Sequence, residues 1–144
     1  MKTPALFAFA LPNNGPSVGR TPVHSMKTAQ TKNFGAPDEL REFPSGQVEM
    51  VTLGDATIGR ATLQPGWRWS TCVQPIAQTP SCQMPHLQYH VSGVLRVKMD
   101  DGTEFDCKAG DISAIPPGHD AWVIGDEPVV IVDFQGMVDY AKAH

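Results

Sequence analysis

Four side chains that can bind a transition metal lie in two short segments of this 144-residue chain. Cys82, His86 and His90 belong to CQMPHLQYHVSG, and His119 belongs to GDISAIPPGHD. One thiolate with several imidazoles is a ligand set that suits Zn²⁺, Fe²⁺ or Cu better than Mg²⁺ or Ca²⁺. The two segments therefore predict a site for a divalent transition metal, provided that the fold brings them together.

The spacing of these residues indicates which of them can share one face of a strand. Successive side chains on a strand point to opposite faces, so His86 and His90 lie on the same face. His119 reaches the same cavity if the strand containing Ala121 begins early. Asp120 is the nearest carboxylate in sequence, and a regular strand turns it to the opposite face from His119. Each candidate also has a structural alternative: a free cysteine is commonly a small buried hydrophobe, and a buried histidine can be held by hydrogen bonds alone.

Short apolar runs separated by turn residues fill the chain from Gly46 onward and must position these side chains. Runs of this kind predict β-strands over 48–53, 56–63, 87–91, 94–99, 104–107, 112–115, 121–124 and 129–134. Many short strands with regularly spaced turns are typical of an all-β sandwich or barrel. Residues 71–85 are expected to form a loop, and residues 38–42 one helical turn.

Composition excludes several classes of partner and compartment. The formal net charge is −4 and the pI is about 5.6, which argues against nucleic acid or an anionic membrane as a partner, because both require a basic surface. The three cysteines form no CxxC pair, so a disulfide framework is not expected. We therefore expect a reducing, cytoplasmic location. No run approaches the roughly 20 apolar residues of a membrane span.

The chain divides into three parts by composition. Residues 1–45 are rich in turn and linker residues and are interpreted as an irregular N-terminal extension that leads into the domain, with 1–25 as an arm able to dock on a neighbouring subunit. Residues 46–136 form the predicted β-barrel. Residues 137–144 are expected to be a C-terminal tail or a short helix.

Two motifs in order carry a resemblance to a known family. Gly110–Gly118 fits a Gly, five residues and then Pro-x-Gly, and the spacing from His86 to Gly93 fits a ligand position followed by a turn glycine. These segments resemble the two motifs of the cupins, in the RmlC-like jelly-roll superfamily. The chain is most similar to small single-domain cupins that carry GWRWS and PPGHDAW segments. The resemblance implies a double-stranded β-helix (jelly-roll) barrel, and a homodimer, because cupins commonly dimerise.

The ligand positions of metal-binding cupins carry over poorly to this chain. In those proteins two His of an H-x-H motif, one Glu and one later His hold the metal. These four positions correspond here to Pro80, Cys82, His86 and Ala121. None keeps its usual identity, so Cys82, His86, His90 and His119 are substitutes that could form a rebuilt site.

Two hypotheses about function follow. In the first, a metal held by some of these four residues binds a small oxygenated ligand or substrate, with dioxygenation, isomerisation and lyase chemistry all open. In the second, the barrel is metal-free and acts as a small-molecule-binding or regulatory module without catalysis. The clustering of three histidines and one cysteine favours the first, and the lost ligand identities favour the second. Whether the protein is an enzyme is left open.

Overall fold

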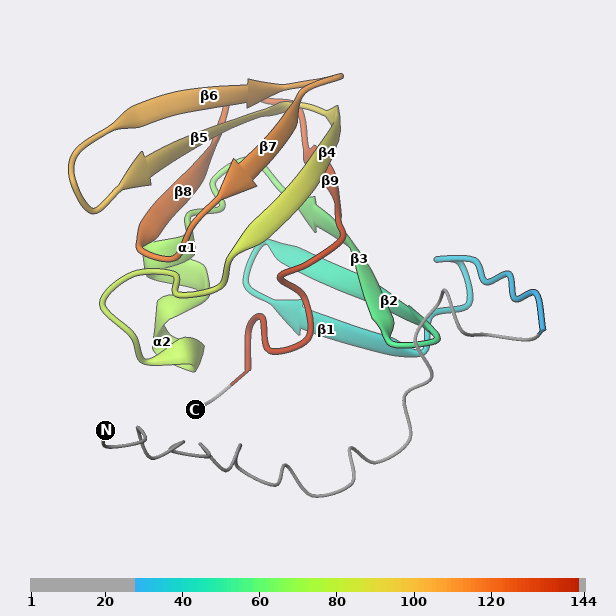
Figure 1. Cartoon of the computed structure of the whole chain (residues 1–144). Helices are drawn as coiled ribbons and strands as arrows, with labels where there is room; N and C mark the ends of the chain where they lie inside the picture. The colour runs from blue at the N-terminus through green and yellow to red at the C-terminus, as the bar shows by residue number, and fades with distance from the viewer. Residues whose placement is uncertain (1–27, 143–144) are drawn as a thin grey trace, which may run out of the picture.

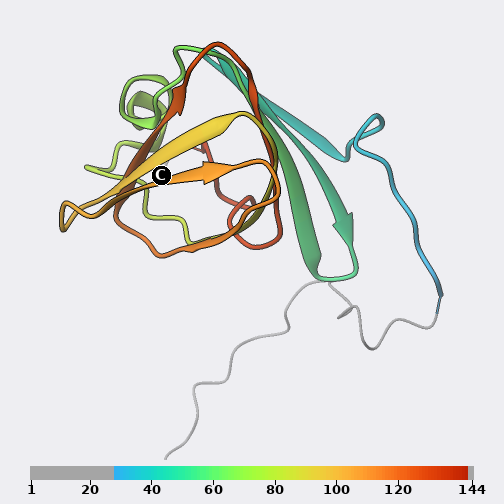
Figure 2. The ribbon, with the colours of Figure 1, turned by 90° about the horizontal axis from the view of Figure 1, so that it is seen from above.

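The structure, a computed structural model, describes residues 28–142 and consists mainly of two antiparallel sheets (Figure 1). The six-stranded sheet has the order β1-β2-β3-β9-β4-β7 and the three-stranded sheet the order β6-β5-β8. The strands are β1 (Glu39–Phe43), β2 (Gly46–Leu53), β3 (Ala56–Leu63), β4 (His86–Ser92), β5 (Val94–Met99), β6 (Glu104–Lys108), β7 (Ile112–Ile115), β8 (His119–Ile124) and β9 (Val129–Asp133). Seen from above, the sheets curve round a common interior (Figure 2). The predicted all-β jelly-roll architecture is therefore confirmed.

Alternating burial along each strand separates the interior of the barrel from its surface. On β4 the side chains of His86, Gln88 and His90 are buried, while those between them are exposed. On β9 the inward positions are Val129, Ile131 and Asp133. This follows from the two-residue period of a strand. As a result, β4 and β9, which are neighbours in the sheet, direct both apolar and polar side chains into one interior.

Two local expectations from the sequence are wrong. Residues 38–42 form no helical turn: Glu39–Phe43 is strand β1, paired antiparallel with β2, so the sheet begins before Gly46. The expected loop 71–85 is interrupted by short helices α1 (Trp69–Cys72) and α2 (Gln74–Ala77), the second of which has Pro75 in its first turn, where proline is favoured. Of the two alternatives for residues 137–144, a tail or a short helix, the described residues 137–142 form bends and turns and no helix. The expected arm over residues 1–25 lies outside the described residues.

A C-terminal strap, defined here as Gly136–Lys142, closes one side of the barrel. The guanidinium of Arg41 on β1 donates hydrogen bonds to three of its backbone carbonyls, at Met137 (3.0 Å), Val138 (2.8 Å) and Tyr140 (2.6 Å). Met137 and Tyr140 are buried, and the Tyr140 ring packs edge-on against Phe43 with a centroid distance of 6.0 Å. One forked cation therefore fixes a segment that would otherwise have no ladder partner.

The outer face of β4 is apolar and exposed. Leu87, Tyr89 and Val91 are 42%, 44% and 46% exposed, and Ile112 on the neighbouring β7 is 74% exposed. Binding of a second copy to such a face stays a prediction. Neither helix in the described part of the chain is long and apolar enough to cross a membrane.

Replacing Arg41 by Lys should loosen the strap, because an ammonium group carries its three N–H donors on one nitrogen and cannot reach the three carbonyls that Nη1 and Nη2 of the guanidinium contact together. We expect a loss of about 1–3 kcal/mol in the free energy of unfolding, measured by urea denaturation, together with faster hydrogen exchange in the strap. The matched control is Arg60→Lys, because Arg60 forms a more exposed ion pair with Glu49 that should be worth less than about 1 kcal/mol. Equal losses in the two variants would contradict this role for Arg41.

Candidate metal centre

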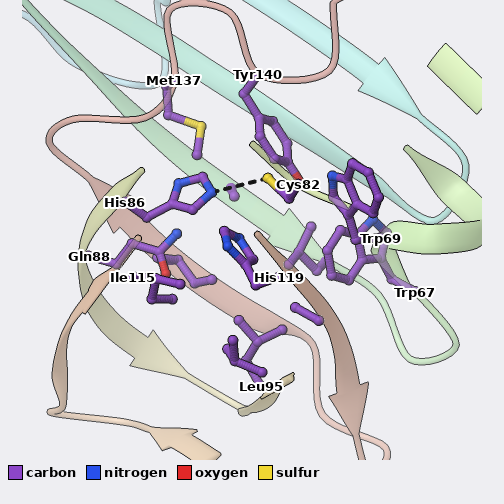
Figure 3. A pocket seen from close by; sticks show the side chains of 15 residues that line it. Trp67, Trp69, Cys82, His86, Gln88, Leu95, Ile115, His119, Met137 and Tyr140 are labelled. Atoms are coloured by element: carbon purple, nitrogen blue, oxygen red, sulfur yellow. Dashed lines mark hydrogen bonds between the residues drawn. The ribbon is translucent and has the colours of Figure 1, made fainter. Parts of the chain in front are cut away.

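Three of the four predicted metal ligands meet inside the barrel. The ligand atoms of Cys82, His86 and His119 all lie within 4.8 Å of one another. The three side chains are buried, with exposures of 2%, 4% and 4%. Cys82 Sγ lies 3.6 Å from His86 Nε2, and the two imidazole rings are 5.2 Å apart at an interplanar angle of 69° (Figure 3). This grouping brings together the two segments that the sequence singled out.

Backbone pairing brings Cys82 and His119 together. Cys82 N–H donates to the carbonyl of His119 at 2.7 Å, and Gly118 N–H donates to the carbonyl of Cys82 at 2.7 Å. Gly118 has a positive φ of 94°, a conformation that glycine adopts without strain and that ends the Pro-Pro-Gly turn. Strand β8 consequently begins at His119, two residues earlier than expected, and His119 shares the buried face with Ala121.

Both His86 and His119 are oriented by a hydrogen-bond acceptor at Nδ1. Nδ1 of His86 lies 2.5 Å from Asp133 Oδ2, and Nδ1 of His119 lies 2.9 Å from the carbonyl oxygen of Pro116. Because both partners can only accept, each Nδ1 carries the proton and each Nε2 is left to face the cluster. Metal-ligating histidines are usually oriented in this way. The arrangement of donor atoms therefore fits a transition metal.

Asp133 is a site residue that the sequence interpretation missed. Its side chain is fully buried at the end of β9, where Oδ1 accepts from the backbone N–H groups of Gln135 (2.8 Å) and Gly136 (2.9 Å). A Cβ atom at Gly136 would collide with the ring of His86, so glycine is required there. The available signal was the alternation Val129, Ile131, Asp133, which places the carboxylate on the same face as two apolar core residues.

Mutual hydrogen bonding makes the cluster ionic in the absence of a metal. Burial alone would raise the pKa of Cys82, but the adjacent imidazoles of His119 and His86 lower it from 9.0 to about 6. Burial alone would lower the pKa of His86, but Asp133 and the Cys82 thiolate raise it to about 9. Burial likewise opposes ionisation of Asp133, and its bond to His86 nevertheless holds its pKa below the usual value. At neutral pH Cys82 is therefore a thiolate, His86 an imidazolium and Asp133 a carboxylate.

His90 does not join this group. It lies on the same face of β4 as His86, is 1% exposed, and its Nε2 lies 2.7 Å from Ser113 Oγ. Its Nδ1 has no hydrogen-bond partner among residues 28–142. Asp120 also points elsewhere, as strand alternation predicts: its carboxylate accepts from Ser70 N–H at 3.1 Å and faces Arg68 at 3.6 Å.

A small cavity of about 30 Å³ adjoins the three residues. Its walls are mainly apolar and come from β3, β4, β5, β7, β8, β9, α1, the segments before α1 and before β4, and the strap. Trp67, Trp69, Leu95, Met137 and Tyr140 surround the Cys82–His86–His119 group (Figure 3). The strap, which the sequence interpretation treated as a tail, thus contributes two side chains to the site. A ligand beside the cluster would be shielded from bulk water.

No protein-family model matches this chain, and neither does any curated protein sequence. Solved structures do match it. A structural-genomics protein of unknown function from Rhizobium leguminosarum superposes with a TM-score of 0.56 at 18% identity, over 81% of this chain and 99% of that one. A DUF1255 protein from Acinetobacter superposes with a TM-score of 0.51 at 16% identity, over 68% of this chain and 90% of that one.

Oxalate decarboxylase from Lactobacillus farciminis, solved as a formate complex, matches with a TM-score of 0.50 at 22% identity. The match covers 71% of this chain but only 32% of the decarboxylase, so the chain spans about a third of that enzyme. Identities this low reveal the fold and no shared activity. Together with the two curved antiparallel sheets, these matches show that the chain has a small cupin-like jelly-roll fold.

Proposed function

We propose that this cupin-like barrel binds a divalent transition metal through Cys82, His86 and His119 and holds a small oxygenated ligand or substrate beside it. The observation that carries the proposal is the orientation of the two imidazoles. Each has its Nδ1 proton directed to a fixed acceptor, so each presents Nε2 towards the Cys82 sulfur. Such second contacts are typical of metal-ligating histidines and unnecessary for packing alone.

The donor set favours Zn²⁺, Fe²⁺ or Cu, because a thiolate and two imidazoles are softer ligands than Mg²⁺ or Ca²⁺ prefers. Three protein ligands would leave a coordination position open, as in catalytic sites. Held by these three residues, the metal would act as a Lewis acid and polarise an oxygen atom of the small-molecule ligand. The chain's own part is to orient the ligands: Asp133 holds the Nδ1 proton of His86, and the strap keeps water from the cluster.

Wild-type protein purified without a His-tag should contain close to one equivalent of Zn, Fe or Cu by elemental analysis. Cys82→Ser and His119→Gln should each lose most of that metal, because each removes one of three ligands. Cys107→Ser and His90→Gln are the matched controls and should keep it, since both replace buried residues outside the group. A metal-free wild type that takes up no added Zn²⁺, Fe²⁺ or Cu²⁺ would favour the metal-free binding module instead.

Asp133→Asn should weaken metal binding without removing one of the three metal ligands. The amide keeps an oxygen for the backbone N–H groups of Gln135 and Gly136 but loses the negative charge that holds the ring of His86. Loss of such an outer partner typically costs about 10–100-fold in metal affinity, measurable by competition with a chelator. Ser113→Ala, which removes the partner of His90, serves as the control and should leave the affinity unchanged.

A second candidate function is supported by the linear order Cys82, His86, Asp133. Sulfur to Nε2 is 3.6 Å and Nδ1 to carboxylate is 2.5 Å, which is the order of groups in a nucleophile, base and orienting acid. In a metal-free protein, Cys82 Sγ would form a bond to an electrophilic carbon of a small substrate, the bond from that carbon to its leaving group would break, and the leaving group would take the proton from His86 Nε2.

Alkylation of Cys82 with and without added Zn²⁺ separates the two candidates, and its pH dependence tests the lowered pKa of the thiol. In metal-free Cys72→Ala/Cys107→Ala protein, where Cys82 is the remaining cysteine, iodoacetamide should react at a rate that falls as the pH drops through about 6, because the thiolate is lost below its pKa. Added Zn²⁺ should suppress the reaction if the metal proposal holds. Mass spectrometry of the modified protein gives the rate of alkylation at each pH. A midpoint of this pH profile near the ordinary thiol pKa of 9.0 would contradict a lowered pKa at Cys82.

A further inference from the structure

An outer patch of exposed apolar side chains extends over three neighbouring strands of the six-stranded sheet. Its members lie on β4 and β7, which run side by side in Figure 1, and directly after β9: Leu87, Tyr89, Val91, Ile112 and Phe134. The exposed fractions of the five lie between 42% and 74%. Large apolar side chains that are gathered on one face usually mark a contact surface, whereas scattered ones need no explanation.

The area of the outer patch limits what can cover it. About half of each of the five side chains is exposed. Because a large side chain has ~150–250 Å² of surface, the five together present on the order of 400 Å² to solvent. A standard interface between two proteins buries about 800 Å² on each partner. The outer patch therefore suits a short segment better than the face of a second copy.

The chain enters the domain along the same face of the sheet. The guanidinium carbon of Arg60 on β3 lies 5.1 Å from the centroid of the Phe34 ring. The strand register forms one row of opposed residues across this face, in the order Arg60, Val132, Tyr89 and Ile112. Neighbouring strands are about 4.8 Å apart, so the far end of the row is only about 14 Å from Arg60 along the sheet. Phe34 thus already contacts the face that carries the outer patch.

An apolar run upstream of this contact has the period of a strand. Residues 5–11 read ALFAFAL and are bounded by a proline on each side. Seven residues are too few for a stable isolated helix, and residues two apart share a face in an extended chain. Phe7, Phe9 and Leu11 therefore fall on one side. The same two-residue spacing separates the three members of the outer patch on β4.

Covalent linkage and charge both favour the run's own domain as its partner. The 22 residues between Leu11 and Phe34 can span up to about 70 Å, several times the length of the row. A linked segment has an effective concentration of about millimolar at its own domain, so a second copy competes poorly. Residues 1–27 also hold three of the eleven basic residues and none of the fifteen acidic ones, which gives them the opposite charge to the rest of the chain.

We infer that residues 5–11 pack across the outer patch of their own chain, with Phe7, Phe9 and Leu11 turned towards β4 and β7. The inference goes beyond the proposed function, because it concerns the outside of the barrel and holds with or without a metal. It also narrows the expectation from the sequence, in which this arm docks on a neighbouring subunit.

The two tyrosines of the chain give a direct readout of this contact. N-acetylimidazole acetylates accessible phenols, and Tyr89 belongs to the outer patch whereas Tyr140 is buried. Phe7→Ser/Phe9→Ser should raise the rate of acetylation at Tyr89 at least about fivefold over wild type, because the patch is then uncovered more often. The rate is measured by mass spectrometry of the peptide that contains Tyr89.

Val18→Ser/Val23→Ser is the matched control for this measurement. It makes two apolar positions polar in the same N-terminal part of the chain but outside the run. This variant should react at Tyr89 as wild type does. Equal rates at Tyr89 in wild type and in Phe7→Ser/Phe9→Ser would overturn the inference.

Photo-cross-linking in full-length protein locates the run. The cross-linker p-benzoylphenylalanine replaces Phe9 in an equal mixture of ¹⁴N- and ¹⁵N-labelled chains. It should form cross-links to peptides of β4 or β7, with both peptides of each pair carrying the same isotope. Ile112→Lys should lower this yield at least about threefold, because the contact would bury a charge. Leu40→Lys is the matched control, since Leu40 is 49% exposed on β1, at the opposite edge of the sheet from β7, and it should leave the yield unchanged.

The isotope pattern distinguishes the chain's own run from that of a second copy. Cross-linked pairs of mixed isotope would show that the run covers a neighbouring molecule and would overturn the inference. Cross-links confined to other segments, or a failure of the run to cross-link at all, would overturn it as well.

Discussion

The hydrogen bond between His86 and Asp133 lies in the interior of the barrel, where the two side chains are 4% and 0% exposed. Taking an imidazolium and a carboxylate out of water costs several kcal/mol for each ion, and only close pairing with further hydrogen bonds offsets that cost. The structure supplies them: two backbone N–H groups and the amide of Gln88 satisfy Asp133, and Cys82 satisfies the other side of His86. The identity of Gly136, the orientation of Gln88 and the backbone turn into the strap all depend on this pair.

The sequence predicts the barrel well because its signals are local. Alternation over β4 and the glycine turns between strands identify the elements and put His86 on an inward face, whereas His119 faces inward because β8 begins two residues earlier than the sequence predicts. The failures arise where long-range packing decides. Residues 38–42 have a helix-compatible composition, yet five consecutive residues pair with β2, and the ladder overrides the local preference. Asp133 sits in an apolar strand 47 residues from His86, and nothing near either residue announces their contact.

The strand register relates the candidate ligands of this chain to the ligand positions of metal-binding cupins. The usual histidine position corresponds to Ala121, and the side chain two residues earlier on the same face, His119, takes its place at the interior. Pairing of Cys82 with His119 makes this substitution possible, because it extends β8 towards the segment before β4. The position where those cupins have a Glu ligand is occupied here by His86. A carboxylate is still present behind it, because Asp133 forms a hydrogen bond with Nδ1 of His86. The departures from the family pattern thus form a consistent set.

The strap also sets the order in which the site can be completed during synthesis. Arg41 and Val138, which its guanidinium contacts, are 97 residues apart, so most of the barrel must emerge from the ribosome before that bond can form. Until then Met137 and Tyr140 are absent from the interior, and Cys82, His86 and His119 are open to the surrounding solution on that side. Contacts so distant in sequence form late in folding. Under the proposed function, a metal ion would therefore have its easiest access before the last strand and the strap are in place.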